Sequence, residues 1–181
     1  MKKKVGNPAS SEFKDLPGIE YFNFEEDFIE KNIRCIPMIV RLKLDSAGIK
    51  LKLDEWSKLE VDERIELATR QCSNDDEAKK YRDHAGELVK KRSGKEVTDL
   101  PVDANPEWAN VHKIPDLLAD KLREISLTIR LEQWARLTDL QRFALLKLCR
   151  PGHENKNFPK ALIEFGLRSS ISLLSGSKTG T

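Results

Sequence analysis

The chain has 181 residues, about the size of one domain, and is long enough to bury a core without disulfide or metal staples. Although 34% of the residues are charged, the 39% that are hydrophobic argue against a disordered chain, and no run approaches the roughly 18 apolar residues of a membrane span. Lys and Arg number 32 and Asp and Glu 30, so the net charge of +2 favours no particular polyanion.

The cysteines and the termini predict a cytoplasmic protein. The three cysteines are an odd number without C-x-x-C spacing and do not make a disulfide framework. The N-terminus starts with charged residues but lacks the apolar stretch of a signal peptide. Residues 1–17 and 169–181 are polar, and we expect a flexible arm and a flexible tail on either side of a single domain at 18–168.

Apolar residues at helical spacing predict the first helices in chain order. The first follows Pro37 and ends at Gly48. The next lies within residues 73–94, because Ser73 or Asn74 can cap it, acidic residues lie at its start, and basic residues and Gly94 lie at its end. No stretch gives a clear signal for a strand.

Two further helices are predicted in the second half. One begins behind Pro115 and carries apolar residues as far as Ile125. The other follows a capping box of Thr138 and Gln141 and is apolar almost all round, so we expect it at the centre of the core. The predicted fold class is therefore all-α.

The helical segments also contain an internal repeat. Residues 36–70 align with residues 114–148 without a gap, and nine of the 35 positions are identical. Each copy combines a Pro-started helix, a short helix with a Trp and a helix with an Arg, so we expect one compact body of two pseudo-repeat units with approximate two-fold symmetry. The two tryptophans are interpreted as core anchors, with aromatic platforms at a binding surface as the alternative. The identical pairs are Ile36/Ile114, Pro37/Pro115, Lys43/Lys121, Leu44/Leu122, Leu53/Leu131, Trp56/Trp134, Leu59/Leu137, Arg64/Arg142 and Leu67/Leu145.

The stretch LCRPGHENKNF, at 148–158, is the least helix-like dense stretch and has no counterpart in the first repeat. A polar turn on a rigid helical body often displays a recognition surface, which favours a protein-binding module. The alternative is that Arg150, His153 and Glu154 only tie the loop down by hydrogen bonds. The turn residues predicted to bind a partner are Arg150, Pro151, Gly152, His153, Glu154, Asn155 and Lys156.

Two chemical alternatives use the same stretch. Cys149 and His153 have C-x₃-H spacing and supply two metal ligands, which Cys35 and Cys72 complete only if the fold brings them together. The same Cys149 and His153 are the only local nucleophile and base, and no third residue that would orient them is identifiable. Three separate buried thiols are the simpler interpretation, and we expect a protein that is not an enzyme and has no cofactor.

Nucleic-acid binding is not favoured either. The helix after Thr138 would be the reading helix of a helix-turn-helix, but its first turns are too apolar to lie in a DNA groove. The nine glycines form no phosphate-binding loop. We therefore expect neither nucleic acid nor membrane as a partner.

Taken together, FNFEEDF, RCIPMIVRLKLDSAGIKL, the W-x-x-L units and LQRFALLKLCRPGHENKNFPKALIEFGL resemble the bacterial nitrate reductase-associated protein family. The resemblance runs from about Gly18 to Leu167, and its most specific pieces are RCIPM at 34–38 and RPGHEN at 150–155. It carries over no catalytic residue, and it adds Arg34 to the predicted partner-binding surface.

The resemblance implies a small helical protein linked to assimilatory nitrate reductase and needed for its activity. The implied role is an accessory or maturation factor that acts on molybdenum cofactor insertion, on iron–sulfur assembly or on keeping the apoenzyme competent. The implied partner is the reductase or its cofactor-delivery machinery. The alternative function is a metal- or cluster-binding carrier that uses Cys35, Cys72, Cys149 and His153.

Overall fold

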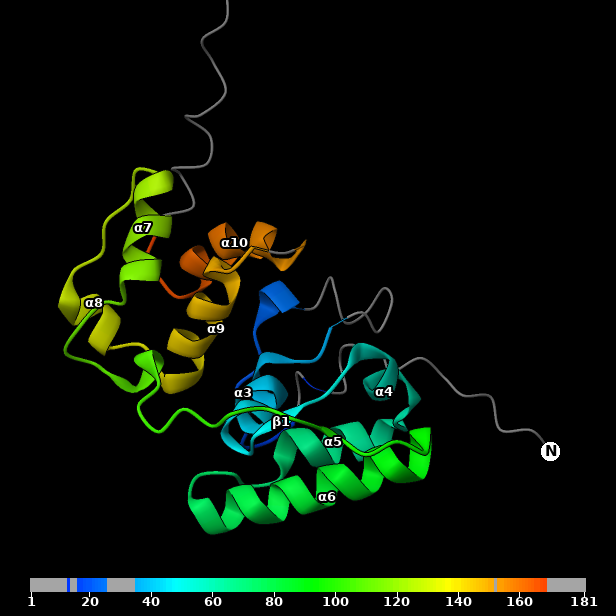
Figure 1. Cartoon of the computed structure of the whole chain (residues 1–181). Coiled ribbons are helices and arrows are strands. Elements are labelled where there is room, and N and C mark those ends of the chain that lie inside the picture. The colour runs from blue at the N-terminus through cyan, green and yellow to red at the C-terminus, as the bar shows by residue number, and fades with distance from the viewer. Residues whose placement is uncertain (1–12, 14–15, 26–34, 152, 169–181) are drawn as a thin grey trace, which may run out of the picture. The chain divides into compact units, whose positions relative to one another are not determined.

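The computed structural model describes residues 13, 16–25, 35–151 and 153–168, except for the side chains of residues 153 and 154. These residues form helices and one small two-stranded sheet, so the predicted mostly helical class is confirmed. The chain divides into two compact units, Met1–Ala104 (unit 1) and Asn105–Thr181 (unit 2), and Figure 1 shows both. The single domain at 18–168 and the two-fold symmetry stay predictions.

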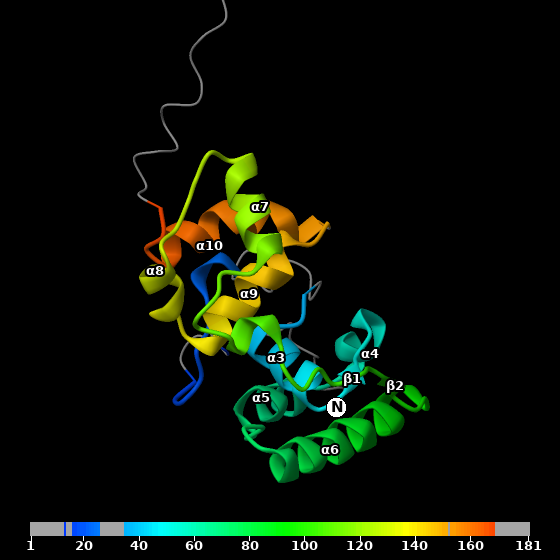
Figure 2. The ribbon, with the colours of Figure 1, turned by 60° about the vertical axis from the view of Figure 1, so that its left-hand side comes forward.

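Unit 1 is built on the long helix α6, against which the shorter helices α3, α4 and α5 pack (Figures 1 and 2). Two short strands close the unit in an antiparallel pair with Ile49 opposite Asp99 and Lys50 opposite Thr98. The sequence gives no signal for these strands, because two residues are too few to show an alternating pattern. The elements of unit 1 are α3 (Met38–Ser46), β1 (Ile49–Lys50), α4 (Leu53–Lys58), α5 (Val61–Thr69), α6 (Asp75–Ser93) and β2 (Thr98–Asp99).

Helix α6 has the end signals that its sequence predicts. The Asn74 side chain caps it by accepting a hydrogen bond from the backbone N–H of Glu77 at 2.9 Å. Acidic residues in its first turn and basic residues in its last turn complement the helix dipole. Gly94 ends the helix in the left-handed conformation, with φ 72°.

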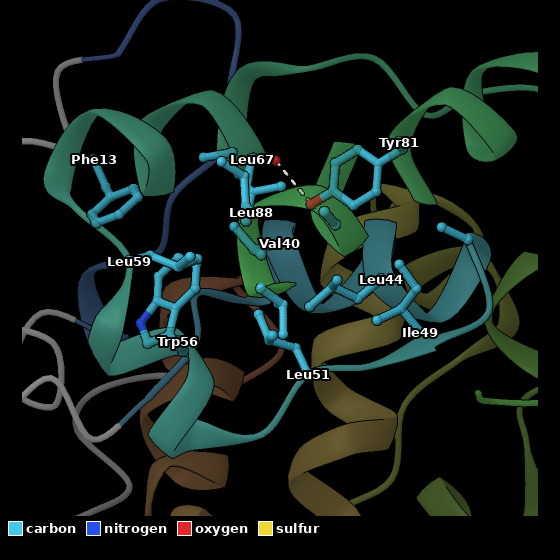
Figure 3. Packing of buried hydrophobic residues seen from close by; sticks show 14 residues of the cluster. Phe13, Val40, Leu44, Ile49, Leu51, Trp56, Leu59, Leu67, Tyr81 and Leu88 are labelled. Atoms are coloured by element: carbon cyan, nitrogen blue, oxygen red, sulfur yellow. Dashed lines mark hydrogen bonds between the residues drawn. The ribbon is translucent and has the colours of Figure 1, made fainter. Parts of the chain in front are cut away.

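Much of the core of unit 1 is a hydrophobic cluster, shown in Figure 3. Tyr81 of α6 is buried in it, and its hydroxyl donates to the carbonyl of Leu67 at 3.0 Å, which satisfies the polar end of the ring. Phe13 belongs to the same cluster and is 1% exposed, although it lies in the segment expected to be a flexible arm. The cluster comprises Phe13, Val40, Leu44, Ala47, Ile49, Leu51, Trp56, Leu59, Leu67, Ala68, Tyr81, Ala85, Leu88 and Val89.

Unit 2 is arranged around α9, which packs against η1, α7, η2 and α10 (Figures 1 and 2). Eight of the 11 residues of α9 are buried, so the predicted central position of this helix in its core is confirmed within the unit. Its capping box is also present, because the Thr138 hydroxyl accepts from the N–H of Gln141 and the Gln141 side chain accepts from the N–H of Thr138. The elements of unit 2 are η1 (Glu107–Ala109), α7 (Asp116–Glu124), α8 (Leu131–Ala135), α9 (Asp139–Cys149), η2 (His153–Asn157) and α10 (Phe158–Glu164).

The helices of the two units start at equivalent positions. Helices α3, α4 and α5 start at residues 38, 53 and 61, and α7, α8 and α9 start at residues 116, 131 and 139, which is 78 residues later in each case. Shortly after α3 and after α7 the backbone is left-handed, at Gly48 with φ 69° and at Ser126 with φ 55°. These two positions are also 78 residues apart. Equivalent positions therefore begin three helices in each unit, and α3 and α7 also end at equivalent positions.

A buried arginine lies over the tryptophan in each unit. Trp56 and Trp134 are 2% and 0% exposed, which confirms their interpretation as core anchors. The guanidinium of Arg64 lies 5.5 Å from the Trp56 ring centroid, and that of Arg142 lies 5.8 Å from the Trp134 ring centroid. We call these two contacts, Arg64–Trp56 and Arg142–Trp134, the Arg–Trp clamps.

Backbone carbonyls satisfy both guanidinium groups. Arg64 donates to the carbonyls of Trp56 at 3.2 Å and Ser57 at 2.9 Å, where α4 ends. Arg142 donates to the carbonyls of Trp108, at 2.6 Å, and Leu137. Each arginine thus binds carbonyl groups near the end of a short helix, and its charge can be buried because its donors are used.

Candidate functional site

The predicted partner-binding turn begins where α9 ends. Leu148 and Cys149 are buried in the last turn of the helix, and the next residue, Arg150, is extended with ψ 146°. Its N–H still donates to the carbonyl of Lys147 at 3.3 Å, and Pro151 then follows, a residue that cannot continue a helix. The apolar end of α9 therefore holds one side of the turn.

The other side of the turn is held by the start of α10. Phe158, Ala161 and Leu162 are buried at helical spacing, and Pro159 lies in the first turn of the helix, where its missing N–H costs no hydrogen bond. Gly166 ends α10 in the left-handed conformation with φ 68°. The turn is thus a short segment between two anchored helices of the same unit.

Between these anchors, three of the described side chains are exposed to solvent. Arg150, Pro151 and Lys156 are exposed and Asn155 is half-buried. The Arg150 side chain makes no hydrogen bond or ion pair with any residue that the structure describes, so the alternative in which it ties the loop down is not supported for this side chain. This outcome favours a displayed surface.

Four predicted site residues have no described side chain. His153 and Glu154 lie in η2, but their side chains are outside the description, and Gly152 and Arg34 are outside it altogether. Their part in partner binding stays a prediction.

Asn157 closes the turn with an unusual feature. Its side chain is only 4% exposed, and its Oδ1 accepts no hydrogen bond from any described residue. A buried acceptor without a donor costs about 1–3 kcal/mol, and the burial of the neighbouring Phe158 stabilises the junction of η2 and α10 against this cost.

The cysteines are divided between the two units. Cys35 and Cys72 lie half-buried in unit 1, where the Cys72 thiol donates to the carbonyl of Lys43 at 3.6 Å, and Cys149 lies in unit 2. Among the residues that can be described, no group of three or more His, Cys, Asp or Glu side chains is placed to hold a metal ion. The Cys149–His153 pair stays a prediction, because the His153 side chain is outside the description.

Burial makes the free Cys149 thiol a poor nucleophile. It raises the pKa of the Cys149 thiol to about 12, more than the charge of Lys121 lowers it. Because the thiolate is the reactive form, this environment disfavours nucleophilic catalysis by Cys149 at neutral pH.

Two basic side chains next to the turn were missed by the sequence analysis. Lys160 is exposed on α10, and the ammonium group of Lys147 lies 5.1 Å from the ring centroid of Phe143 on α9. The local net charge of the sequence could have indicated them, because residues 147–168 contain five Lys and Arg but two Asp and Glu. The net charge of the whole chain conceals this excess.

The comparisons with known proteins agree with the resemblance seen in the sequence. The model of the conserved nitrate reductase-associated protein family matches residues 21–165, close to the expected span of about 18 to 167. No curated protein and no solved structure matches the chain. No helix in the described part is both long and apolar enough to cross a membrane. Since the family model covers most of its residues, the chain belongs to the conserved nitrate reductase-associated protein family.

Proposed function

We propose that the protein is a non-catalytic accessory or maturation factor that supports assimilatory nitrate reductase in the cytoplasm by protein–protein binding. Membership of the nitrate reductase-associated family suggests the enzyme that it serves. The observation that carries the mode of action is the exposure of Arg150, Pro151 and Lys156 on a turn between the buried ends of α9 and α10. Such a turn can bind a partner without a large change in its backbone.

The environment of Cys149 supports a binding role over an enzymatic one. Cys149 was the only local candidate nucleophile, and burial raises its pKa to about 12. The direct partner is the apoenzyme or the machinery that delivers its cofactors, and we place the contact on unit 2.

Co-expression with apo nitrate reductase tests the proposal. We expect the two proteins to elute together from a sizing column and to separate once the reductase holds its cofactors, as a maturation factor would. Persistent co-elution with the mature enzyme would instead indicate a subunit or regulator. No complex with either form would remove the proposal.

Variants of the turn test the surface. Arg150→Ala and His153→Ala should fold normally and lose support of reductase activity. Arg136→Ala, which removes another exposed cation of unit 2, is the matched control and should keep it. Unchanged reductase activity with both turn variants would exclude this turn as the contact.

A further inference from the structure

The two units carry opposite net charge. Residues 1–104 contain 20 Lys and Arg against 22 Asp and Glu, whereas residues 105–181 contain 12 against eight. The chain total of +2 therefore combines a net charge of −2 in unit 1 with +4 in unit 2. The positive excess belongs to the unit that carries the turn.

Within unit 2, the acidic residues before the turn are matched by basic ones. All but one of the acidic side chains from Glu107 to Arg142 form ion pairs with basic side chains of the same stretch. The pairs are Lys113–Asp116 at 3.3 Å, Arg123–Asp120 at 2.7 Å, Lys121–Glu124 at 2.6 Å, Arg130–Glu132 at 3.8 Å and Arg142–Asp139. This stretch is close to locally neutral, so the positive excess lies further along the chain.

The excess is concentrated around the turn. Lys147 and Arg150 are one helical turn apart at the end of α9, and Lys156 and Lys160 are four residues apart across η2 and α10. These three elements pack against one another, so the four side chains lie on adjacent segments of one compact region. We name Lys147, Arg150, Lys156 and Lys160 the basic surface.

We propose that the basic surface binds an acidic segment of a protein partner. The proposal rests on the proposed function and adds the chemistry of the partner: a stretch of clustered Asp and Glu side chains that meets these ammonium and guanidinium groups. Opposite charges on two proteins accelerate their encounter and exclude partners of the wrong charge. Exposed pairs of this kind exchange readily, which suits a factor that must leave its client.

The surroundings favour an acidic protein over a nucleic acid or a membrane. Phe143 and Phe158 are buried, so they offer no face on which bases could stack. The apolar face of α10 is buried against its own unit, so it cannot enter a lipid interface. Four cations on a nearly neutral chain are also few for binding a phosphate backbone, because proteins that bind DNA at physiological salt typically make more phosphate contacts than four.

A charge-reversal series on the full chain tests the proposal. The test variant carries Arg150→Glu, Lys156→Glu and Lys160→Glu. The matched control carries Lys58→Glu, Lys79→Glu and Lys80→Glu, three exposed cations of unit 1, and has the same net charge as the test variant. Circular dichroism first shows that both variants keep the helical content of the wild type.

Binding is measured with three probes by fluorescence anisotropy. The probes are a labelled peptide of alternating Glu and Ser, a labelled single-stranded DNA and labelled phosphatidylserine vesicles. We expect the test variant to weaken peptide binding about 10-fold and the control less than about twofold. Equal losses in both variants would overturn the proposal, because they would show a response to net charge alone. Tighter binding of DNA or vesicles than of the peptide would overturn the class of partner.

Carbodiimide coupling with nitrate reductase separates this proposal from the proposed function. The reagent joins a lysine amine to a carboxylate with loss of water, and we expect links from Lys156 and Lys160 to acidic residues of the reductase. A complex that survives in the test variant and is cross-linked through other lysines would contradict binding through the basic surface. It would still agree with the proposed function. Peptide binding lost only in the test variant, without any complex with the reductase, would keep the acidic partner and sink the proposed function.

Discussion

Single residues decide how the short helices of this protein are stabilised. The helices α4 and α8 have six and five residues, too few to be stable alone. In each unit an arginine eleven residues after the start of the short helix reaches back to the tryptophan of that helix. Arg64 lies over Trp56, and Arg142 lies over Trp134. One buried cation thereby ties a short helix to the longer helix that follows it.

Cys149 provides a first prediction at the scale of the residue. Since burial raises its pKa to about 12 from an ordinary value of 9.0, the thiolate fraction at pH 8 should fall about a thousandfold. We expect iodoacetamide to label Cys149 at least about 100-fold more slowly in the folded protein than in urea, as followed by peptide mass spectrometry. Rapid labelling of the folded protein would restore Cys149 as a candidate nucleophile.

Gly48 and Gly94 form a matched pair for a second prediction. Both are left-handed, with φ of 69° and 72°, but a Cβ at Gly48 would lie 2.9 Å from Val102 Cγ2 and 3.0 Å from the Leu100 carbonyl oxygen, whereas one at Gly94 would meet nothing within 4 Å. We expect Gly94→Ala to cost about 1 kcal/mol and Gly48→Ala at least about 2 kcal/mol in urea unfolding. Equal costs would mean that the contacts with Leu100 and Val102 do not constrain the chain.

At the scale of the element, ion pairs join α5 to the end of α6. The Glu63 carboxylate, on α5, accepts from Arg92 at 2.8–3.0 Å and from Lys91 at 3.2 Å, both on α6. It also accepts from the N–H of Glu60 at 2.9 Å and so caps its own helix. A single carboxylate therefore caps the start of α5 and pairs with basic side chains at the end of α6.

The charge of Glu63 gives a third prediction. Burial alone would raise its pKa, but the hydrogen bonds from Arg92, from the Glu60 backbone and from Lys91 together lower it to about 2 from 4.5. A depressed carboxyl pKa contributes stability that is present above pH 4.5 and lost as the pH falls towards 2. Glu63→Gln keeps an oxygen for the cap and removes the charge.

We expect Glu63→Gln to lower the free energy of unfolding at pH 7 by about 1–2 kcal/mol, a modest figure because Lys91 and Arg92 reach solvent. In urea titrations, the difference between variant and wild type should shrink below pH 4.5 and vanish near pH 2. A difference that stays constant with pH would show that the helix cap, and not the charge, matters.

At the scale of the whole molecule, each unit has its own Arg–Trp clamp. Replacing Arg142 by Met leaves the Trp108 and Leu137 carbonyls without their donor, which we expect to cost about 2–4 kcal/mol. Because the clamp lies within unit 2, amide hydrogen exchange in Arg142→Met should accelerate in residues 105–168 more than in residues 35–104.

Arg64→Met is the reciprocal variant and should accelerate exchange in residues 35–104 instead. Equal acceleration in both ranges, in both variants, would show that the chain unfolds as the single domain at 18–168 that the sequence analysis expects. Peptide-level mass spectrometry of the exchange reaction separates these outcomes.

Much of the fold follows from local sequence signals. Pro37 and Pro115, the capping residues Asn74 and Thr138, and the period of apolar residues placed helices close to their true bounds, because these signals act within a few residues of the chain. The paired strands were missed, since their pairing joins residues about 50 positions apart. Phe13 in the core was missed for the same reason.

The candidate site was only partly predictable. The sequence by itself determined that a polar turn follows the most apolar helix, because Pro151 and Gly152 cannot continue α9. Only the tertiary structure decided which side chains near this turn reach solvent, that Cys149 is buried and that Lys160 joins the exposed cations. The signals that begin and end a helix lie in neighbouring residues, so they could be recognised in the sequence. Burial depends on which distant segments pack together, so it was decided only by the tertiary structure.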